Sequence, residues 1–285
     1  EKYIMHIRMS IRTRKTIICG IIILLSLLYL YTNRTLYTNE QKYTNVQNKN
    51  ISLKLLLAAA IRAAEIGGSE VIAVHNQAKF EIQSKGKTKE GINDPVTEAD
   101  YRSHCAMYHS LREAFPSITV ISEETSKDCD KVTVSNIKDN INTLNEYDIK
   151  DEIINTNDIT VWIDPLDATK EFTENLLQYV TTMVCVAIKG KPVIGVIFKP
   201  FETKQNSINL LYYLGNVTAY VHMTAIKKWD ICAGTAILTA LGGTVTQLFD
   251  QQLISFGPND SKVLTWGLLA TMSNHAWYLD KFSNI

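Results

Sequence analysis

The chain has 285 residues, of which 46% are apolar, and its 29 basic and 29 acidic residues leave no formal net charge. This length is enough for one large domain or two small ones. Balanced charge gives no long-range positive field, so the composition excludes a basic protein that binds a nucleic-acid polymer. An anionic substrate must instead be held locally by metal ions and a few placed cations.

The N-terminal region predicts a membrane anchor. Residues 1–15 are rich in arginine and lysine, and an apolar run follows over 16–31. The run is short for a plasma-membrane span but sufficient for thinner secretory membranes. Because basic flanks stay cytosolic, we expect a single-pass type II orientation with a lumenal body. A cleaved signal peptide is the main alternative, although no small-x-small pair follows the run. A buried core helix fits less well, since only one flank is charged.

Residues 32–50 are polar and without periodicity, so we expect a stalk between the membrane and the body. Four tripeptides of the Asn-x-Ser/Thr type suit glycosylation of a lumenal protein and begin at Asn33, Asn50, Asn216 and Asn259. Such tripeptides are common by chance, so they only support the predicted topology.

The five cysteines have no CxxC or zinc-type spacing. They are Cys19, Cys105, Cys129, Cys185 and Cys232. Cys185 and Cys232 lie in apolar runs, which predicts that both are buried in the core.

We expect the folded body to span 51–285 and to begin with a helix that Ser52 caps. Apolar spacing predicts that this helix reaches Ile66, where Gly67–Gly68 stops it, and that it kinks or resumes towards Val74. The stretch Ser84–Gly91 is predicted to be a loop of lysines and glycines. The stretch lacks the first glycine of the G-x-x-x-x-G-K-[ST] motif, so we reject a loop that binds a nucleotide triphosphate.

The next acidic motif is predicted at the start of a second helix. Thr97 suits the cap and Asp100 falls in the first turn, where the helix dipole favours a carboxylate; Pro116 ends the helix. A short strand, Thr119–Ser122, then leads to Glu123-Glu124. Taken alone, such a pair is usually a solvated surface feature.

After a polar segment, 127–158, that predicts a loop or insert, a β-branched run from Ile159 to Ile163 predicts a buried strand. Pro165 is incompatible with a continuing central strand, so we expect the backbone to turn and leave Asp164 and Asp167 on the same side. Two carboxylates there suit Mg²⁺. A solvated surface turn is the alternative.

Two further elements are predicted after this strand, a β-hairpin and a helix. The runs Tyr179–Ile188 and Val193–Lys199 predict a β-hairpin. Asp230 opens a helix that Gly242-Gly243 ends, and on position alone it is as well explained as a helix cap.

The candidate acids share one property: each follows a strand or begins a helix. They are Asp100, Glu123, Asp164, Asp167 and Asp230. Such ends meet at one cleft in layered α/β folds. Carboxylates so close repel one another unless cations are bound, which predicts two or more Mg²⁺ ions.

Four motifs, in order, resemble the inositol monophosphatase superfamily of Mg²⁺-dependent, lithium-sensitive phosphatases. They are Asp94-Pro-Val-Thr-Glu-Ala-Asp100, Ser122-Glu-Glu-Thr125, Trp162-Ile-Asp-Pro-Leu-Asp-Ala-Thr169 and Trp229-Asp-Ile-Cys-Ala-Gly234. Ala168 stands where most members have glycine, and Lys170 is typical of nucleotide-directed relatives. With the predicted anchor, the chain is similar to the Golgi branch whose members remove the 3′-phosphate of 3′-phosphoadenosine 5′-phosphate.

The resemblance implies an α/β fold, an αβαβα sandwich, with a role for each motif residue. The implied metal ligands are Glu123, Asp164, Asp167, Asp230 and the Leu166 carbonyl. Asp100 with Thr169 would hold the attacking water, and the backbone N–H groups of Ala168 and Thr169 would bind phosphate. The implied partner is a small phosphonucleotide, and both a monomer and a homodimer fit.

One departure concerns the second half. Only residues 202–215 separate Phe201 from Asn216, where the family has several tens more, including substrate-recognising elements. We therefore expect a metal-binding half, 51–201, and a shortened half, 202–285. An active Golgi phosphatase and an inactive anchored remnant are both consistent with this, whereas an inositol monophosphate phosphatase is less favoured. A glycosyltransferase needs a D-x-D motif, and the spacing of Asp164 and Asp167 does not supply one.

Overall fold

The computed structural model describes Ser26, Leu28, Tyr29 and residues 49–77, 81–87, 93–125, 129, 137, 144, 149–202 and 218–282. The chain divides into two compact units, Glu1–Lys49 and Asn50–Ile285.

In the N-terminal unit, Ser26, Leu28 and Tyr29 are helical. The rest of the predicted span at 16–31, almost all of the stalk and Asn33 lie outside the described residues. No helix among the described residues combines the length and the apolar character that crossing a membrane requires.

The body begins with a helical layer made of α2 (Leu53–His75) and α3 (Glu98–Ala114). Ser52 caps α2 as predicted, since its hydroxyl accepts the backbone N–H of Leu55. The predicted stop at Gly67–Gly68 is wrong, because α2 runs through both glycines.

These two glycines serve packing rather than termination. A Cβ on Gly67 would come within 2.5 Å of the Met107 sulfur of α3, and one on Gly68 within 2.5 Å of the Phe198 ring. Glycine at these positions therefore lets α3 and the sheet approach α2 closely.

The start of α3 follows the prediction. Thr97 is the N-cap, and its side chain and that of Asp100 form a capping box. The helix ends at Ala114, two residues before Pro116.

A four-stranded mixed sheet lies beneath the two helices, in the order β4-β6-β7-β8. Its strands are β4 (Thr119–Ser122), β6 (Ile159–Asp167), β7 (Thr181–Ile188) and β8 (Lys191–Phe198). β4 and β6 are parallel, whereas β6, β7 and β8 are antiparallel neighbours. The predicted strand before Glu123 and the predicted hairpin are both present.

The expectation that Pro165 ends the strand is wrong. β6 continues to Asp167, and its pairing with β7 shifts register between Asp164 and Asp167. A β-bulge accommodates the proline, because the bulged residues need no ladder hydrogen bond there.

Two smaller pairs flank the sheet. The stretch predicted as a loop, Ser84–Gly91, overlaps strand β2 (Ile82–Lys87), which pairs with β3 (Asn93–Thr97). The polar stretch 127–158 ends in β5 (Ile153–Asn155), paired with β1 (Asn50–Ser52), and a 3₁₀ turn, η2 (Thr156–Asp158). These assignments replace the loop prediction for 84–87 and 153–158.

The second half adds a helix and a three-stranded sheet of order β11-β13-β9. The elements are β9 (Ala219–His222), β10 (Ile226–Lys227), α5 (Lys228–Ala240), β11 (Thr244–Gln247), β12 (Val263–Leu264), β13 (Leu268–Thr271) and α6 (His275–Phe282). Two short elements follow β6 and precede β7, namely α4 (Thr169–Thr173) and η3 (Leu177–Tyr179).

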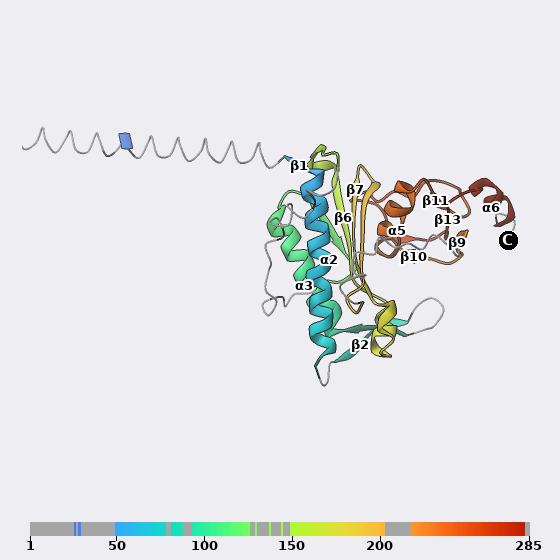
Figure 1. Cartoon of the computed structure of the whole chain (residues 1–285), viewed down its shortest axis with the longest axis horizontal. Coiled ribbons are helices and arrows are strands. Elements are labelled where there is room, and N and C mark those ends of the chain that lie inside the picture. The colour runs from blue at the N-terminus through green and yellow to red at the C-terminus, as the bar shows by residue number, and fades with distance from the viewer. Residues whose placement is uncertain are drawn as a thin grey trace, which may run out of the picture. The chain divides into compact units, whose positions relative to one another are not determined.

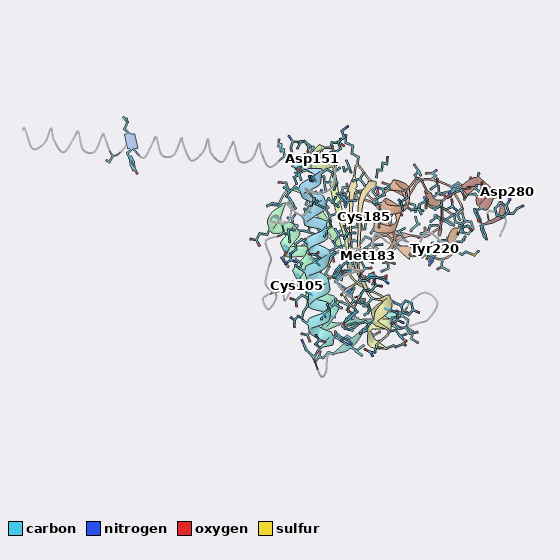
Figure 2. The ribbon with its side chains drawn as sticks, viewed as in Figure 1. Cys105, Asp151, Met183, Cys185, Tyr220 and Asp280 are labelled. Carbon is cyan, nitrogen blue, oxygen red and sulfur yellow. A yellow bond between two sulfur atoms is a disulfide. The ribbon has the colours of Figure 1, made fainter. Side chains whose placement is uncertain are left out.

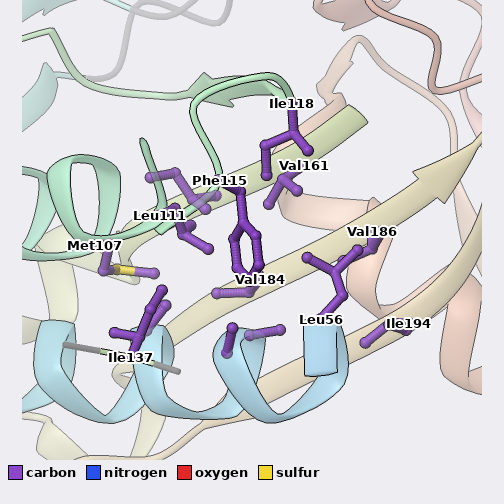
Figure 3. Close-up of a cluster of buried hydrophobic side chains, with 14 of the residues drawn as sticks. Leu56, Met107, Leu111, Phe115, Ile118, Ile137, Val161, Val184, Val186 and Ile194 are labelled. Atoms are coloured by element: carbon purple, nitrogen blue, oxygen red, sulfur yellow. The ribbon is translucent and has the colours of Figure 1, made fainter. Parts of the chain in front are cut away.

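Helices and sheets alternate through the body, as the predicted α/β class requires. α2 and α3 cover one face of the four-stranded sheet and α5 covers the other (Figure 1). The main core lies between the first helical layer and the sheet, where Leu111 and Phe115 of the α3 segment meet Val184 (Figure 3). A small cluster around Leu248, Leu269 and Leu279 joins the three-stranded sheet to α6.

Two disulfides link distant segments. Cys105 of α3 bonds to Cys129, and Cys185 of β7 bonds to Cys232 of α5 (Figure 2 labels Cys105 and Cys185). Cys185 and Cys232 are fully buried, as the apolar runs predicted. Their pairing was not evident from the spacing, because only the packing of α5 on the sheet brings them together.

Candidate active site

Three carboxylates from separate elements converge on one point. Glu123 follows β4, Asp164 lies in β6, and Asp230 is in the first turn of α5. One carboxylate oxygen from each lies within 4.8 Å of the other two. The predicted meeting of strand ends and a helix start therefore occurs at one edge of the sheet.

Asp164 is the most enclosed of these acids, with 1% of its surface exposed. Its Oδ1 accepts the backbone N–H of Leu166 at 3.2 Å, across the bulge that contains Pro165. Burial raises the pKa of Asp164 well above its usual range, and the negative charges of Glu123 and Asp167 add to the increase. The ionised form of Asp164 thus needs a positive charge beside it.

Asp167 lies at the end of β6, outside the three-residue group but close to it. Burial raises its pKa, while a hydrogen bond from the backbone N–H of Ala168 opposes the increase. Ala168 has φ 65° and ψ 44°, which is the left-handed region that favours glycine. This conformation explains why glycine suits the position, and it shows that the Ala168 amide already serves Asp167.

Asp230 is held by its own helix. The N-cap of α5 is Lys227, so the alternative that Asp230 is the cap residue does not hold. Burial raises the pKa of Asp230 to about 8, the charges of Glu123 and Asp167 add to the increase, and the backbone N–H of Lys227 opposes it.

Asp100 occupies the same place in α3 as Asp230 does in α5, the third residue after the cap. Its Oδ2 accepts the backbone N–H of Thr97 at 2.8 Å and the Thr97 hydroxyl at 2.7 Å. Its Oδ1 lies 3.0 Å from the Thr169 hydroxyl, which is also 3.1 Å from the Leu166 carbonyl oxygen. Burial raises the pKa of Asp100, and the hydrogen bonds from Thr97 reduce the increase.

Lys85 of β2 contacts the acidic residues of the site. It was not identified from the sequence, because nothing beyond a high lysine content marked this stretch. Its ammonium group lies 3.0 Å from Glu123 Oε1 and also contacts Glu124. Burial would lower the pKa of Lys85, but Glu123 and Glu124 outweigh that effect and raise it. Burial raises the pKa of Glu124 to about 7.

Tyr220 of β9 was also missed. Burial raises the pKa of its phenol, and the charges of Asp230 and Asp167 raise it further. Its hydroxyl lies 3.3 Å from Nδ1 of His222. A lone tyrosine in a short strand carries no motif, so the sequence offered nothing to identify it.

The donor set suits magnesium. Every candidate side-chain donor in the three-residue group is a carboxylate oxygen, the ligand that Mg²⁺ prefers, and mutual repulsion makes binding of a cation favourable.

Two of the four predicted glycosylation positions are among the described residues. Asn50 and Asn259 are exposed, whereas Asn33 and Asn216 lie outside the described residues.

Residues 52–211 and 205–285 match the inositol monophosphatase family, in two pieces. Inositol monophosphatase 3 of Xenopus tropicalis is 38% identical over an alignment of 297 positions, gaps included, which covers 82% of this chain and 82% of the relative. Golgi-resident adenosine 3′,5′-bisphosphate 3′-phosphatase of mouse is 37% identical over an alignment of the same length, which again covers 82% of each chain.

Solved structures agree on the fold. The structure of CysQ from Bacteroides thetaiotaomicron, a bacterial member of the inositol monophosphatase family, superposes with a TM-score of 0.53 at 18% identity, covering 78% of this chain and 99% of that one. With the acidic centre and the matches above, the chain belongs to the inositol monophosphatase family of metal-dependent phosphatases.

Proposed function

We propose that the chain is a Mg²⁺-dependent phosphomonoesterase that removes the 3′-phosphate of adenosine 3′,5′-bisphosphate, giving AMP and phosphate. The convergence of Glu123, Asp164 and Asp230 within 4.8 Å carries the proposal, because it supplies a site for cations at a point where anionic phosphate would otherwise be repelled. The name of the mouse relative supports the substrate. In the Golgi, this reaction would remove the nucleotide product of sulfotransferases.

The metal ions would be held by the acids around the bulge and the start of α5. The proposed donors are Glu123, Asp164, Asp167, Asp230 and the Leu166 carbonyl. Bound Mg²⁺ would acidify a water and neutralise charge on the phosphate.

The Asp100–Thr169 pair would orient the attacking water. The Thr169 hydroxyl donates to Asp100 and is left with a lone pair that accepts a hydrogen bond from water. A proton from that water passes to the hydroxyl while the hydroxyl proton passes to Asp100. Burial raises the pKa of Asp100, which makes its carboxylate a better proton acceptor. The amide of Thr169 would bind the phosphate, and that of Ala168 would do so only by leaving Asp167.

Inositol monophosphate is the second candidate substrate, because the Xenopus relative carries that name. The two substrates differ in the group beyond the phosphate. Tyr220 is half-exposed and feels the charges of Asp230 and Asp167, and it offers an aromatic face on which an adenine ring would stack. This residue favours the nucleotide.

The decisive experiment measures Mg²⁺-dependent phosphate release by the purified chain from adenosine 3′,5′-bisphosphate and from inositol 1-phosphate. Asp164→Asn should abolish release, whereas Asp158→Asn, a change at the other end of β6, should leave it intact. We expect lithium to inhibit. Release from inositol 1-phosphate alone would overturn the nucleotide assignment.

The inactive-remnant alternative rests on the short segment after Phe201. The family match also divides into two pieces there: the first piece ends at residue 211 and the second begins at residue 205. Inserting a family-length segment after Phe201 should lower KM and raise kcat if the missing part positions substrate. A well-folded extended protein without activity on either phosphate ester would establish the remnant.

The proposed location is the Golgi membrane, with the body in the lumen. The Golgi-resident name of the mouse relative supports it, as do the two disulfides, which form in oxidising compartments. Protease added to sealed microsomes should spare the body, and a glycosidase should reveal glycan at Asn50, Asn216 or Asn259. Digestion of the body would contradict the type II orientation.

A further inference from the structure

The disulfide between Cys185 and Cys232 joins the four-stranded sheet to α5. Both cysteines are at most 1% exposed, and their Cα atoms are 5.7 Å apart. They lie in one hydrophobic cluster with Trp162 and Trp229, between the sheet and the helix.

At this point the helix is pressed against the sheet. Across the strands, Trp162 of β6 pairs with Cys185 of β7, and Cys185 pairs with Gly195 of β8. A Cβ on Gly195 would stand 2.2 Å from the carbonyl oxygen of Ala233 in α5. The disulfide and the glycine thus hold the same turn of α5 against one level of the sheet.

The clamped part of α5 and the strand beneath it are close in sequence to two of the candidate metal ligands. Cys232 follows Asp230 by two residues in α5, and Trp162 precedes Asp164 by two residues in β6. Any lift or slide of α5 on the sheet would therefore change the separation of Asp230 from Asp164 and Glu123.

The bond also spans the part of the chain that departs from the family. It connects residues 47 apart in sequence, and the loop that it closes contains the whole shortened segment after Phe201. The bond therefore gives α5 a second covalent connection to the sheet, in addition to the altered chain path that leads to the helix.

We propose that the Cys185–Cys232 disulfide is a positioning bond that places Asp230 against Asp164 and Glu123, so that the affinity for divalent cations depends on it. The inference rests on the metal site of the proposed function. The second disulfide, Cys105–Cys129, joins α3 to the segment that follows Glu124 and does not involve α5, so it provides a control for the loss of a cross-link.

The test compares C185A/C232A with C105A/C129A in the full chain, with Mg²⁺ alone as the probe. Both variants should melt at lower temperature than the wild type, since each loses a cross-link. The Kd for Mg²⁺, fitted from the rise in melting temperature with Mg²⁺ concentration, should increase about tenfold in C185A/C232A, as for other groups that orient metal ligands. In C105A/C129A it should stay within about twofold, because sites that share no partners act independently to about this precision.

The outcomes separate this inference from the metal site itself. A Mg²⁺ response that is unchanged in C185A/C232A, or weakened equally in both variants, overturns the positioning role while the metal site stands. Absence of any response in the wild type overturns both.

A second measurement needs no variant. In mixtures of reduced and oxidised dithiothreitol, the disulfide becomes two thiols as the reagent's two thiols become its cyclic disulfide. Linkage requires bound Mg²⁺ to favour the Cys185–Cys232 bond by the same factor as the bond favours Mg²⁺. Alkylation and mass spectrometry should show a Mg²⁺-dependent shift of about tenfold at this pair, and little at Cys105–Cys129. Equal shifts at both pairs would show general stabilisation and overturn the inference.

Discussion

The two halves of the body differ in how completely they are packed. Every residue of β6 from Ile159 to Leu166 is buried, and the sheet around it is covered by helices on both faces. The three-stranded sheet of the second half has a smaller core. Large apolar side chains stay exposed there, with Leu253 at 78%, Trp266 at 59% and Trp277 at 57%.

The two halves also contribute different residues to the candidate site. The first half provides Asp100, Glu123 and Asp164, and hydrogen bonds within its own elements hold Asp100 and Asp164. The second half provides Asp230 and Tyr220. The first half thus holds its acids through its own hydrogen bonds, whereas the place of Asp230 depends on how α5 packs on the sheet. Changes in the second half that leave α5 in place are therefore expected to spare the candidate metal site.

The largest expected effect tests the packed half. Asp100→Asn should lower kcat for phosphate release by about 10³-fold, since it removes the proton acceptor behind Thr169. The Mg²⁺-dependent rise in melting temperature should persist, because Asp100 lies outside the three-residue group. Glu98→Gln, an exposed change in the same helical turn, is the control. Loss of the Mg²⁺ response in Asp100→Asn would show that Asp100 belongs to the metal site.

The next effect tests the contact between the halves. Gly195→Ala should lower the free energy of unfolding by about 1–3 kcal/mol, because the new methyl group would meet the backbone of Ala233 and neither backbone moves easily. Urea denaturation measures it. An unchanged stability would mean that α5 shifts freely on the sheet.

The acids make stability depend on pH. Because folding raises the pKa of Asp230 from 3.8 to about 8, the native state binds more protons than the unfolded state between these values. The metal-free protein should therefore lose stability as the pH rises from about 4 to about 8, by roughly 1–2 kcal/mol given the partial exposure of Asp230. Melting in EDTA should show this slope, and Asp230→Asn should reduce it, while the other buried acids keep their share. A slope of the opposite sign would exclude the raised pKa.

The smallest effect tests the open side of the second half. Nothing described lies within 4 Å of a Cβ placed on Gly234 in α5, in contrast to Gly195. Gly234→Ala should therefore raise the free energy of unfolding by about 0.5–1 kcal/mol, the ordinary gain for alanine in a helix. A loss of stability in the same urea assay would reveal that another part of the chain covers this face.

Local sequence determined much of the frame. Ser52 and Thr97 mark helix starts because a cap needs only its next few residues, and the β-branched run before Asp164 forms a strand as its pattern predicts. The acids at these ends were identifiable for the same reason, since an element end and a carboxylate are both visible within a few residues.

Tertiary structure decided the rest. Gly67 and Gly68 follow the usual pattern for a helix end, yet they lie inside α2 because Met107 and Phe198 pack against them. Lys85 and Tyr220 join the site, and Cys185 joins Cys232, only because remote elements meet. Contacts between segments far apart in sequence depend on how helices and sheets stack, and no short stretch of residues carries that information.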